Sequence, residues 1–100
     1  MTLFEAMALL QDMDDEVTVF AVRPWTRNSA AMFGALTEDC RVPTELKAAG
    51  LTYFLEATVA KEIIDDRTRS LLSTEQIAEM LLYYGEFDGF PDWANKLLAF

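Results

Sequence analysis

The chain has no histidine and a single cysteine among its 100 residues. Histidine is the commonest general base near neutral pH and the commonest transition-metal ligand, so its absence excludes most zinc sites and every Ser-His or Cys-His catalytic pair. One cysteine, Cys40, cannot form an intrachain disulfide, which excludes the disulfide-rich folds of small secreted proteins. Its neighbours Asp39 and Arg41 cancel in charge. We therefore expect no activated thiolate at Cys40.

Phosphate-binding loops, basic stripes and long apolar runs are also missing. The 4 glycines never form a glycine-rich loop that ends in Lys-Ser or Lys-Thr, and Lys and Arg form no stripe of the kind that binds nucleic acid. No segment approaches the roughly 20 apolar residues that a membrane span requires, and no basic leader precedes an apolar run at the first residues. We expect a cytoplasmic protein that uses no cofactor and no metal ion, and that touches neither nucleic acid nor membrane directly.

Basic residues are scarce at both ends of the chain, where the net charge of -9 resides. Residues 1–22 contain five carboxylates and no Lys or Arg, and residues 73–100 contain five carboxylates and only Lys96. Residues 23–72 balance seven acids with seven bases. Surplus negative charge repels nucleic acid and anionic lipid, and attracts basic surfaces over long range. The charge pattern therefore indicates a basic macromolecule as the partner.

The chain does contain enough apolar material for one folded domain over residues 1–100. Apolar residues make up 52% of it and aromatic residues 12%, whereas disordered acidic chains lack such residues. A chain of this length buries about two-thirds of its unfolded surface on folding, so a core can form without disulfides or metal. We expect a single acidic domain.

Two capping boxes mark the starts of helices. Thr2 and Glu5 have the Ser/Thr-x-x-Glu/Gln spacing and predict a helix over residues 3–12. Ser73 and Gln76 repeat that spacing, and the apolar residues that follow recur every three or four positions. This second box predicts the clearest helix in the chain.

Glycines are predicted to end two of the helices. Gly85 lies where the helix after the second capping box should end, and Gly50 lies after a short helix that begins near Pro43. A further helix is predicted from a Thr58 cap to about Thr68, with its apolar stripe facing the core.

Three segments have strand character. Glu16–Arg23 is rich in β-branched and aromatic residues on both faces, which predicts a central strand. Ala30–Leu36 is ambiguous, because its Ala and Met content permits a helix, whereas Gly34 and the short length favour a strand paired with the first as a hairpin. Leu51–Leu55 is the third strand. With a last short helix after Pro91, the predicted order is α-β-β-α-β-α-α, and we predict an α+β fold in which a small antiparallel sheet of about three strands packs against helices.

An acidic triplet follows the first predicted helix. Asp12, Asp14 and Glu16 alternate like the opening of a calcium-binding loop. Val17 then occupies the position that requires glycine, and Arg23 the position that requires a bidentate Glu, so the loop could not close around an ion. The triplet is either a solvated turn or a partner contact.

The segment from Tyr83 to Trp93 alternates five aromatic residues with three carboxylates. Aromatic residues form binding hot spots, and carboxylates beside them would meet Arg or Lys on a partner. In the alternative interpretation, four aromatic residues only attach the last two helices to the sheet; these are Tyr84, Phe87, Phe90 and Trp93. Under both interpretations the acids point outward.

Trp25 is a third candidate, directly after Pro24 and between Arg23 and Arg27. A tryptophan at a hairpin tip is a suitable contact point for a partner. It is equally suited to cover the end of the core with its ring packed under an arginine. The sequence leaves both interpretations open.

The stretch from Pro43 to Trp93 resembles a group of small uncharacterised bacterial α+β proteins. The resemblance rests on residues 45–55 (ELKAAGLTYFL) and 82–90 (LYYGEFDGF), because members pair a Gly-Leu-x-Tyr strand entry with a Tyr-Tyr-x-x-x-Asp-x-Phe helix end. It covers about half of the chain, is structural rather than catalytic, and implies no activity. In size, acidity and lack of catalytic residues, the chain is also similar to toxin-immunity proteins and to phage anti-defence inhibitors such as anti-CRISPR proteins, which is an analogy of type.

The leading hypothesis is a non-enzymatic acidic inhibitor of the immunity or anti-CRISPR kind, a monomer or homodimer that blocks a basic, nucleic-acid-binding surface of a partner protein such as a nuclease or a nucleic-acid-binding defence complex. The predicted partner-binding residues are Asp12, Asp14, Asp15, Glu16, Trp25, Glu86, Asp88, Asp92 and Trp93. The alternative is an oligomeric structural or adaptor subunit whose C-terminal apolar interface contains Trp93, Leu97, Leu98 and Phe100. A third hypothesis, a small enzyme that uses carboxylates alone, would need two acids that converge in a pocket.

Overall fold

The computed structural model describes residues 1–98 and contains a three-stranded antiparallel sheet. The strands are β1 (Thr18–Val22), β2 (Ala31–Gly34) and β3 (Leu51–Glu56). Their spatial order is β2-β1-β3, so β1 is the central strand, as its two apolar faces predict. The segment that the sequence left ambiguous is strand β2, which pairs with β1 as a hairpin in the register that places Phe20 opposite Met32.

Six helices accompany the sheet within residues 1–98. They are α1 (Leu3–Leu10), α2 (Thr44–Ala48), α3 (Ala57–Ile63), α4 (Asp66–Leu71), α5 (Thr74–Phe87) and α6 (Asp92–Leu98). The predicted α+β class and the order of elements are confirmed, and the helical part after β3 is divided among four helices. Among the described helices, none has the length and apolarity that a bilayer crossing would require.

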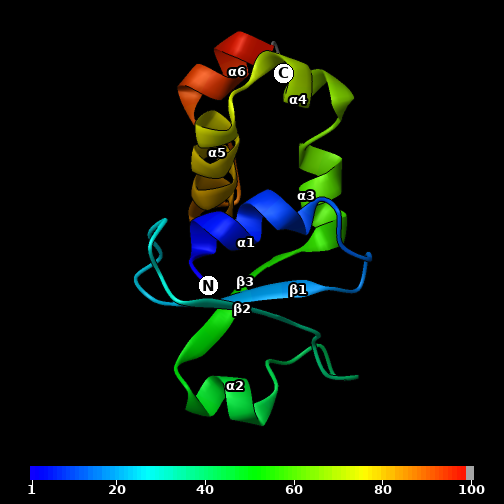
Figure 1. Ribbon diagram of the computed structural model, residues 1–100, viewed down its shortest axis with the longest axis vertical. Coiled ribbons are helices and arrows are strands. Elements are labelled where there is room, and N and C mark those ends of the chain that lie inside the picture. Colours follow the sequence, from blue (N-terminus) through cyan, green and yellow to red (C-terminus); the bar gives the residue numbers. More distant parts are fainter. Residues whose placement is uncertain (99–100) are drawn as a thin grey trace.

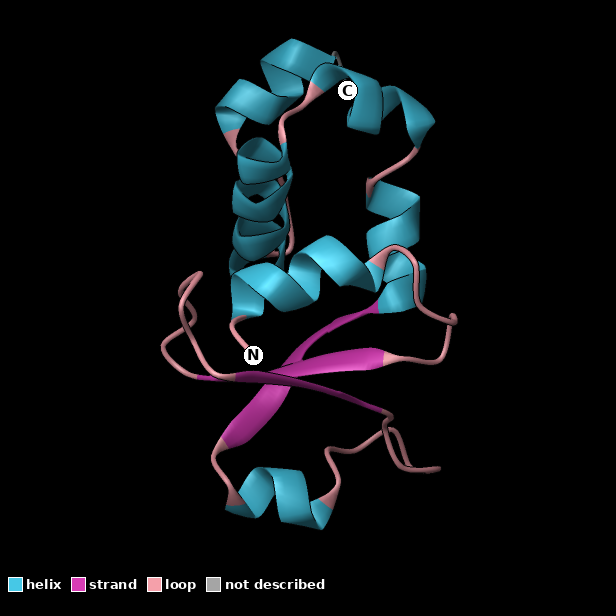
Figure 2. Cartoon of the chain, in the orientation of Figure 1, coloured by secondary structure: helices cyan, strands magenta, loops and turns pink. Residues whose placement is uncertain are grey.

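The sheet separates a large helical layer from a small one. Figure 1 shows α1 and the later helices on one side of the sheet and α2 alone on the other, and Figure 2 shows the same layers coloured by type of structure. The molecule measures 40 × 24 × 21 Å, and α4 and α6 lie at the end of the long axis farthest from the sheet. Exposed residues occur along the whole of α5, from Thr74 and Glu75 at its start to Glu86 and Phe87 at its end.

The main core lies between β1 and α1. Side chains alternate across a strand, so Val19 and Ala21 face the helices while Phe20 faces α2. On the α1 side, the apolar residues recur at helical spacing and are fully buried; they are Leu3, Ala6, Met7 and Leu10. On the opposite face, Phe20 is also fully buried, and it lies beside Gly34 and Leu46. The core is thus built on both faces of one strand.

Both predicted capping boxes are present. The Glu5 backbone N–H donates to the Thr2 hydroxyl at 3.2 Å, and the Thr2 backbone N–H donates to the Glu5 carboxylate at 2.9 Å. The hydrogen bonds from Thr2 lower the pKa of Glu5. Ser73 and Gln76 make the same reciprocal pair at the start of α5, at 2.9 and 3.1 Å. The sequence predicts these features well because each capping box involves residues only three positions apart.

Gly85 does not end α5, so that prediction is wrong. The helix continues to Phe87, and Asp88 takes the left-handed conformation that closes it, with φ of 54°. Gly85 is instead a close-contact residue, because a Cβ atom there would lie 2.4 Å from Cε1 of the Phe54 ring. The other predicted helix end is confirmed, since Gly50 follows α2 with φ of 82°.

The helix predicted from Thr58 to Thr68 is two helices. α3 begins directly after β3 with Glu56 as its cap residue, and the Thr58 hydroxyl donates instead to the backbone carbonyl of Asp15 at 2.9 Å. Helix α3 ends at Ile63. Asp65 then caps α4, because its carboxylate accepts a hydrogen bond from the Thr68 backbone N–H at 2.8 Å. A local capping preference therefore starts a new helix where the apolar periodicity alone predicts continuation.

Asp65 gives a prediction for pH dependence. The hydrogen bond from the Thr68 backbone N–H is the largest cause that holds the pKa of Asp65 below its ordinary value of 3.8. A carboxyl group with a lowered folded-state pKa stabilises the fold above its unfolded-state pKa and loses that contribution as the pH falls. Asn caps helices about as well as Asp but carries no charge. We expect Asp65→Asn to lower the urea midpoint at about pH 7, and the difference from the wild type to shrink below about pH 4. An unchanged difference at about pH 2.5 would contradict this.

Candidate interaction surface

The acids between α1 and β1 are partly neutralised by the helical layer. The Asp15 carboxylate accepts a hydrogen bond from Lys61 Nζ at 2.9 Å, and Asp12 Oδ1 lies 4.0 Å from Arg69 Nη2. Asp14 and Glu16 are exposed and form no ion pair with any residue from 1 to 98. Within the same described range, no three acidic or Cys side chains gather to hold a metal ion.

Two arginines of the loop between β1 and β2 bind the acids of α5. Arg27 donates to both carboxylate oxygens of Glu75, at 2.6 and 3.1 Å, and Arg23 Nη1 donates to both oxygens of Glu86, at 2.9 and 3.2 Å. The hydrogen bond between Arg27 and Glu75 lowers the pKa of Glu75 and raises that of Arg27. These two exposed ion pairs attach the loop to α5 at two points, nearly the length of the helix apart.

The acids around Asp15 and those around Glu86 do not form one face. Asp15 lies in the turn before the central strand β1, whereas Glu86 binds Arg23, which immediately follows that strand. Because β1 has 5 residues, these two points are separated by roughly 17 Å along the strand. Figure 1 shows the corresponding loops at opposite ends of β1. A partner that binds the acids around Glu86 therefore meets a surface distinct from that around Asp15.

Trp25 covers the end of the core. The Trp25 ring packs edge-on against the ring of buried Phe54, with centroids 5.0 Å apart. The guanidinium carbon of Arg23 lies 3.7 Å from the centroid of the Trp25 ring. Its indole N–H lies 3.2 Å from the Thr52 hydroxyl and 3.4 Å from the Ala21 carbonyl. This geometry favours the core-covering interpretation over the contact-point interpretation, both of which the sequence allows.

The aromatic residues at the end of α5 divide into two groups. Tyr84 and Phe90 pack together with ring centroids 5.6 Å apart, and both contact the core, as does Trp93. Burial, followed by the charge of Asp88, raises the pKa of Tyr84, so its hydroxyl stays protonated. These aromatic residues attach α5 and α6 to the rest of the fold, as one of the two interpretations of the segment expects.

Phe87 does not help to attach α5 and α6 to the fold, although that interpretation of the segment included it. It is 65% exposed, the most exposed large apolar side chain in residues 1–98, and Tyr83 is 38% exposed. Their rings lie 4.7 Å apart on successive turns of α5. The pair has the four-residue spacing of neighbours on a helix, but Phe87 also follows buried Met80 by seven residues, so helical periodicity alone would place it on the buried face.

Carboxylates surround this exposed pair. We define the acidic aromatic surface by its residues: Glu79, Tyr83, Glu86, Phe87 and Asp88 of α5 and its end, and Asp92 at the start of α6. Glu79, Tyr83 and Phe87 follow at four-residue spacing on one face of the helix. Beside them lies a hollow of about 320 Å³ whose lining also includes Pro24, Trp25 and Pro91. Of the four carboxylates, only Glu86 has an ion-pair partner within residues 1–98.

The C-terminal apolar residues of the alternative hypothesis are not all available for an interface. Leu98 is 1% exposed and belongs to the core, whereas Leu97 is 47% exposed. Trp93 and Leu97 line an open hollow between α5 and α6. Phe100 lies outside the described residues.

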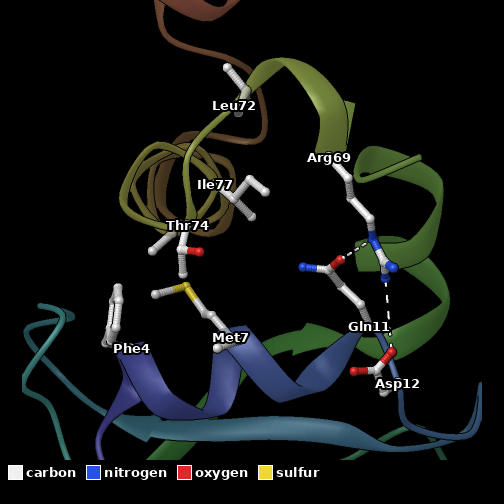
Figure 3. Close-up of a pocket in the computed structure, with 10 residues that line it drawn as sticks. Phe4, Met7, Gln11, Asp12, Arg69, Leu72, Thr74 and Ile77 are labelled. Atoms are coloured by element: carbon white, nitrogen blue, oxygen red, sulfur yellow. Dashed lines mark hydrogen bonds and ion pairs between the residues drawn. The ribbon is translucent and has the colours of Figure 1, made fainter. Parts of the chain in front are cut away.

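A separate pocket lies between α1, α4 and α5, with a volume of about 360 Å³. Figure 3 shows Phe4, Met7 and Ile77 on its apolar side and Gln11 and Arg69 at its polar end. The Arg69 Nε–H donates to Gln11 Oε1 at 2.7 Å. This pocket shares no residue with the acidic aromatic surface.

No family model, curated protein or solved structure matches this chain.

Proposed function

We propose that the protein is a non-enzymatic inhibitor, of the immunity or anti-defence (anti-CRISPR) kind, that binds and covers a basic, nucleic-acid-binding surface of a partner protein. The observation that carries this proposal is the exposed Tyr83–Phe87 ring pair among the carboxylates of the acidic aromatic surface. Aromatic anchors supply most of the energy of protein interfaces. Carboxylates around them select basic partners and accelerate encounter.

The acidic aromatic surface suits this role better than the acids that precede β1. Asp12 and Asp15 already lie beside Arg69 and Lys61, so part of their charge is compensated within the fold. The acids that precede β1 also lack an exposed aromatic pair among the described residues. Their remaining charge acts at long range and supports the approach of a basic partner without a close contact.

Immobilised protein should capture a basic partner from cells of the native host, and the affinity of the purified pair should fall as salt rises from about 50 to 500 mM. The triple variant Glu79→Gln/Asp88→Asn/Asp92→Asn should weaken binding about tenfold or more, because it removes carboxylates that would contact the basic surface as well as charge that steers the approach of the partner.

A second triple variant of equal charge, Asp12→Asn/Asp14→Asn/Glu16→Gln, serves as the matched control. We expect it to bind with less than about threefold loss, since long-range charge is reduced without removing a contact. Equal losses in the two triple variants, or an affinity independent of salt, would contradict the proposed surface.

The alternative function is that of an oligomeric structural or adaptor subunit. The exposed Leu97 and the hollow that it shares with Trp93 favour a contact between α5 and α6 and another molecule. Sedimentation at low micromolar concentration distinguishes the two functions, because an obligate homo-oligomer supports the subunit and a monomer supports the inhibitor.

A further inference from the structure

The pocket between α1, α4 and α5 reaches the main core. Met7 is 1% exposed, Leu72 6% and Ala78 8%, yet all three line the pocket. The pocket therefore extends to side chains that are otherwise almost completely covered. One side of the pocket is apolar and includes Phe4, Met7 and Ile77, whereas the other side includes Gln11, Asp12 and Arg69. The apolar side favours contact with an apolar group over contact with water.

Hydrogen bonding fixes which end of the Gln11 amide faces the pocket. Arginine has donors only, so the atom that faces Arg69 Nε at 2.7 Å must be the amide oxygen, Oε1. The amide nitrogen of Gln11 then points into the pocket, toward Met7 and Ile77, as Figure 3 shows. It has no hydrogen-bond partner within residues 1–98. The pocket therefore offers an oriented N–H donor and favours a ligand that carries an acceptor.

The charge at the polar end is balanced. Asp12 Oδ1 lies 4.0 Å from Arg69 Nη2, so a carboxylate ligand would compete with Asp12 for the guanidinium. The protein also carries a net charge of -9, which repels anions. A neutral ligand with a hydrogen-bond acceptor avoids both the competition with Asp12 and the repulsion by the net negative charge.

We propose that this pocket binds a small neutral carbonyl compound with an unbranched apolar chain, such as a ketone, ester or amide. Its carbonyl oxygen accepts the Gln11 amide N–H, and its chain packs against Phe4, Met7 and Ile77. The volume of about 360 Å³ lies at the lower end of the range for small-molecule sites, which suits a short-chain ligand.

The test is a titration of the ¹⁵N-labelled protein with 2-octanone, followed by NMR. We expect saturable shifts in the side-chain amide signals of Gln11 and in the backbone signals of residues around the pocket, with the side-chain amide of Gln76 unmoved. Gln11→Met keeps the length of the side chain but removes the donor, and should weaken binding about three- to tenfold. Ala8→Trp, at an exposed lining position, should abolish binding by filling the pocket.

One control variant and one control ligand test whether binding occurs in this pocket and favours a neutral compound. Ala48→Trp adds the same bulk to an exposed position on α2, on the other side of the sheet, and should leave binding unchanged. Octanoate should bind at least about tenfold more weakly than 2-octanone if charge balance decides the ligand class. Binding that does not saturate, equal affinity in Gln11→Met, or tighter binding of octanoate would overturn the proposal. None of these outcomes depends on the protein partner.

Discussion

Replacing Gly85 with alanine is expected to lower the free energy of unfolding by about 2 kcal/mol, although alanine favours a helix interior over glycine by about 1 kcal/mol. The new Cβ atom would lie 2.4 Å from Phe54 Cε1 and 3.0 Å from two further atoms of the same ring. Phe54 is only 2% exposed, and its ring is held by Trp25. The buried ring cannot move aside without displacing its neighbours, so we expect overpacking to outweigh helix propensity. Urea denaturation followed by far-UV circular dichroism measures the change.

Gly89→Ala is the matched control. Its new Cβ atom would have a single neighbour within 4 Å, the Phe87 carbonyl at 3.9 Å. We expect a change within about 0.5 kcal/mol. Combining Gly85→Ala with Phe54→Leu should recover part of the loss, because the smaller side chain makes room for the methyl group. A Gly85→Ala protein as stable as the wild type would mean that α5 does not pack on Phe54 this closely.

Gly85 also shows what sequence analysis misses. A glycine near the end of an apolar helical pattern has two explanations, a left-handed helix end or a close contact. Only the position of Phe54, which belongs to β3 and lies far away in the sequence, decides between them. The capping boxes at Thr2 and Ser73 were predictable because both partners lie within one helical turn.

The same limit applies to the candidate site. The sequence places the acids at both ends of the chain, but it does not show that Asp15 meets Lys61 or that Glu86 meets Arg23. Because these two ion pairs lie at opposite ends of β1, the acids around Asp15 and those around Glu86 belong to separate regions of the surface. The exposure of Phe87 could not be predicted from the sequence either, because an aromatic residue in an amphipathic segment is most often buried.

Phe87→Ser is expected to weaken binding to the captured partner by roughly 30- to 1,000-fold, the range of a hot-spot residue. Phe87 is 65% exposed, so its replacement removes little core packing, and the urea midpoint should stay within the range of ordinary surface variants. The loss should therefore appear in the dissociation rate and not in stability. Surface plasmon resonance with the purified partner measures both rates.

Leu97→Ser tests whether any exposed apolar residue would have the same effect. Leu97 is 47% exposed but lies on α6, outside the acidic aromatic surface. We expect less than about a threefold change in affinity for this variant. The salt dependence separates the two parts of the surface, since Phe87→Ser should keep the wild-type slope, whereas the Glu79/Asp88/Asp92 triple variant should flatten it. If Leu97→Ser weakens binding as much as Phe87→Ser, the contact must extend over α6, and the exposed ring pair would lose its place as the anchor.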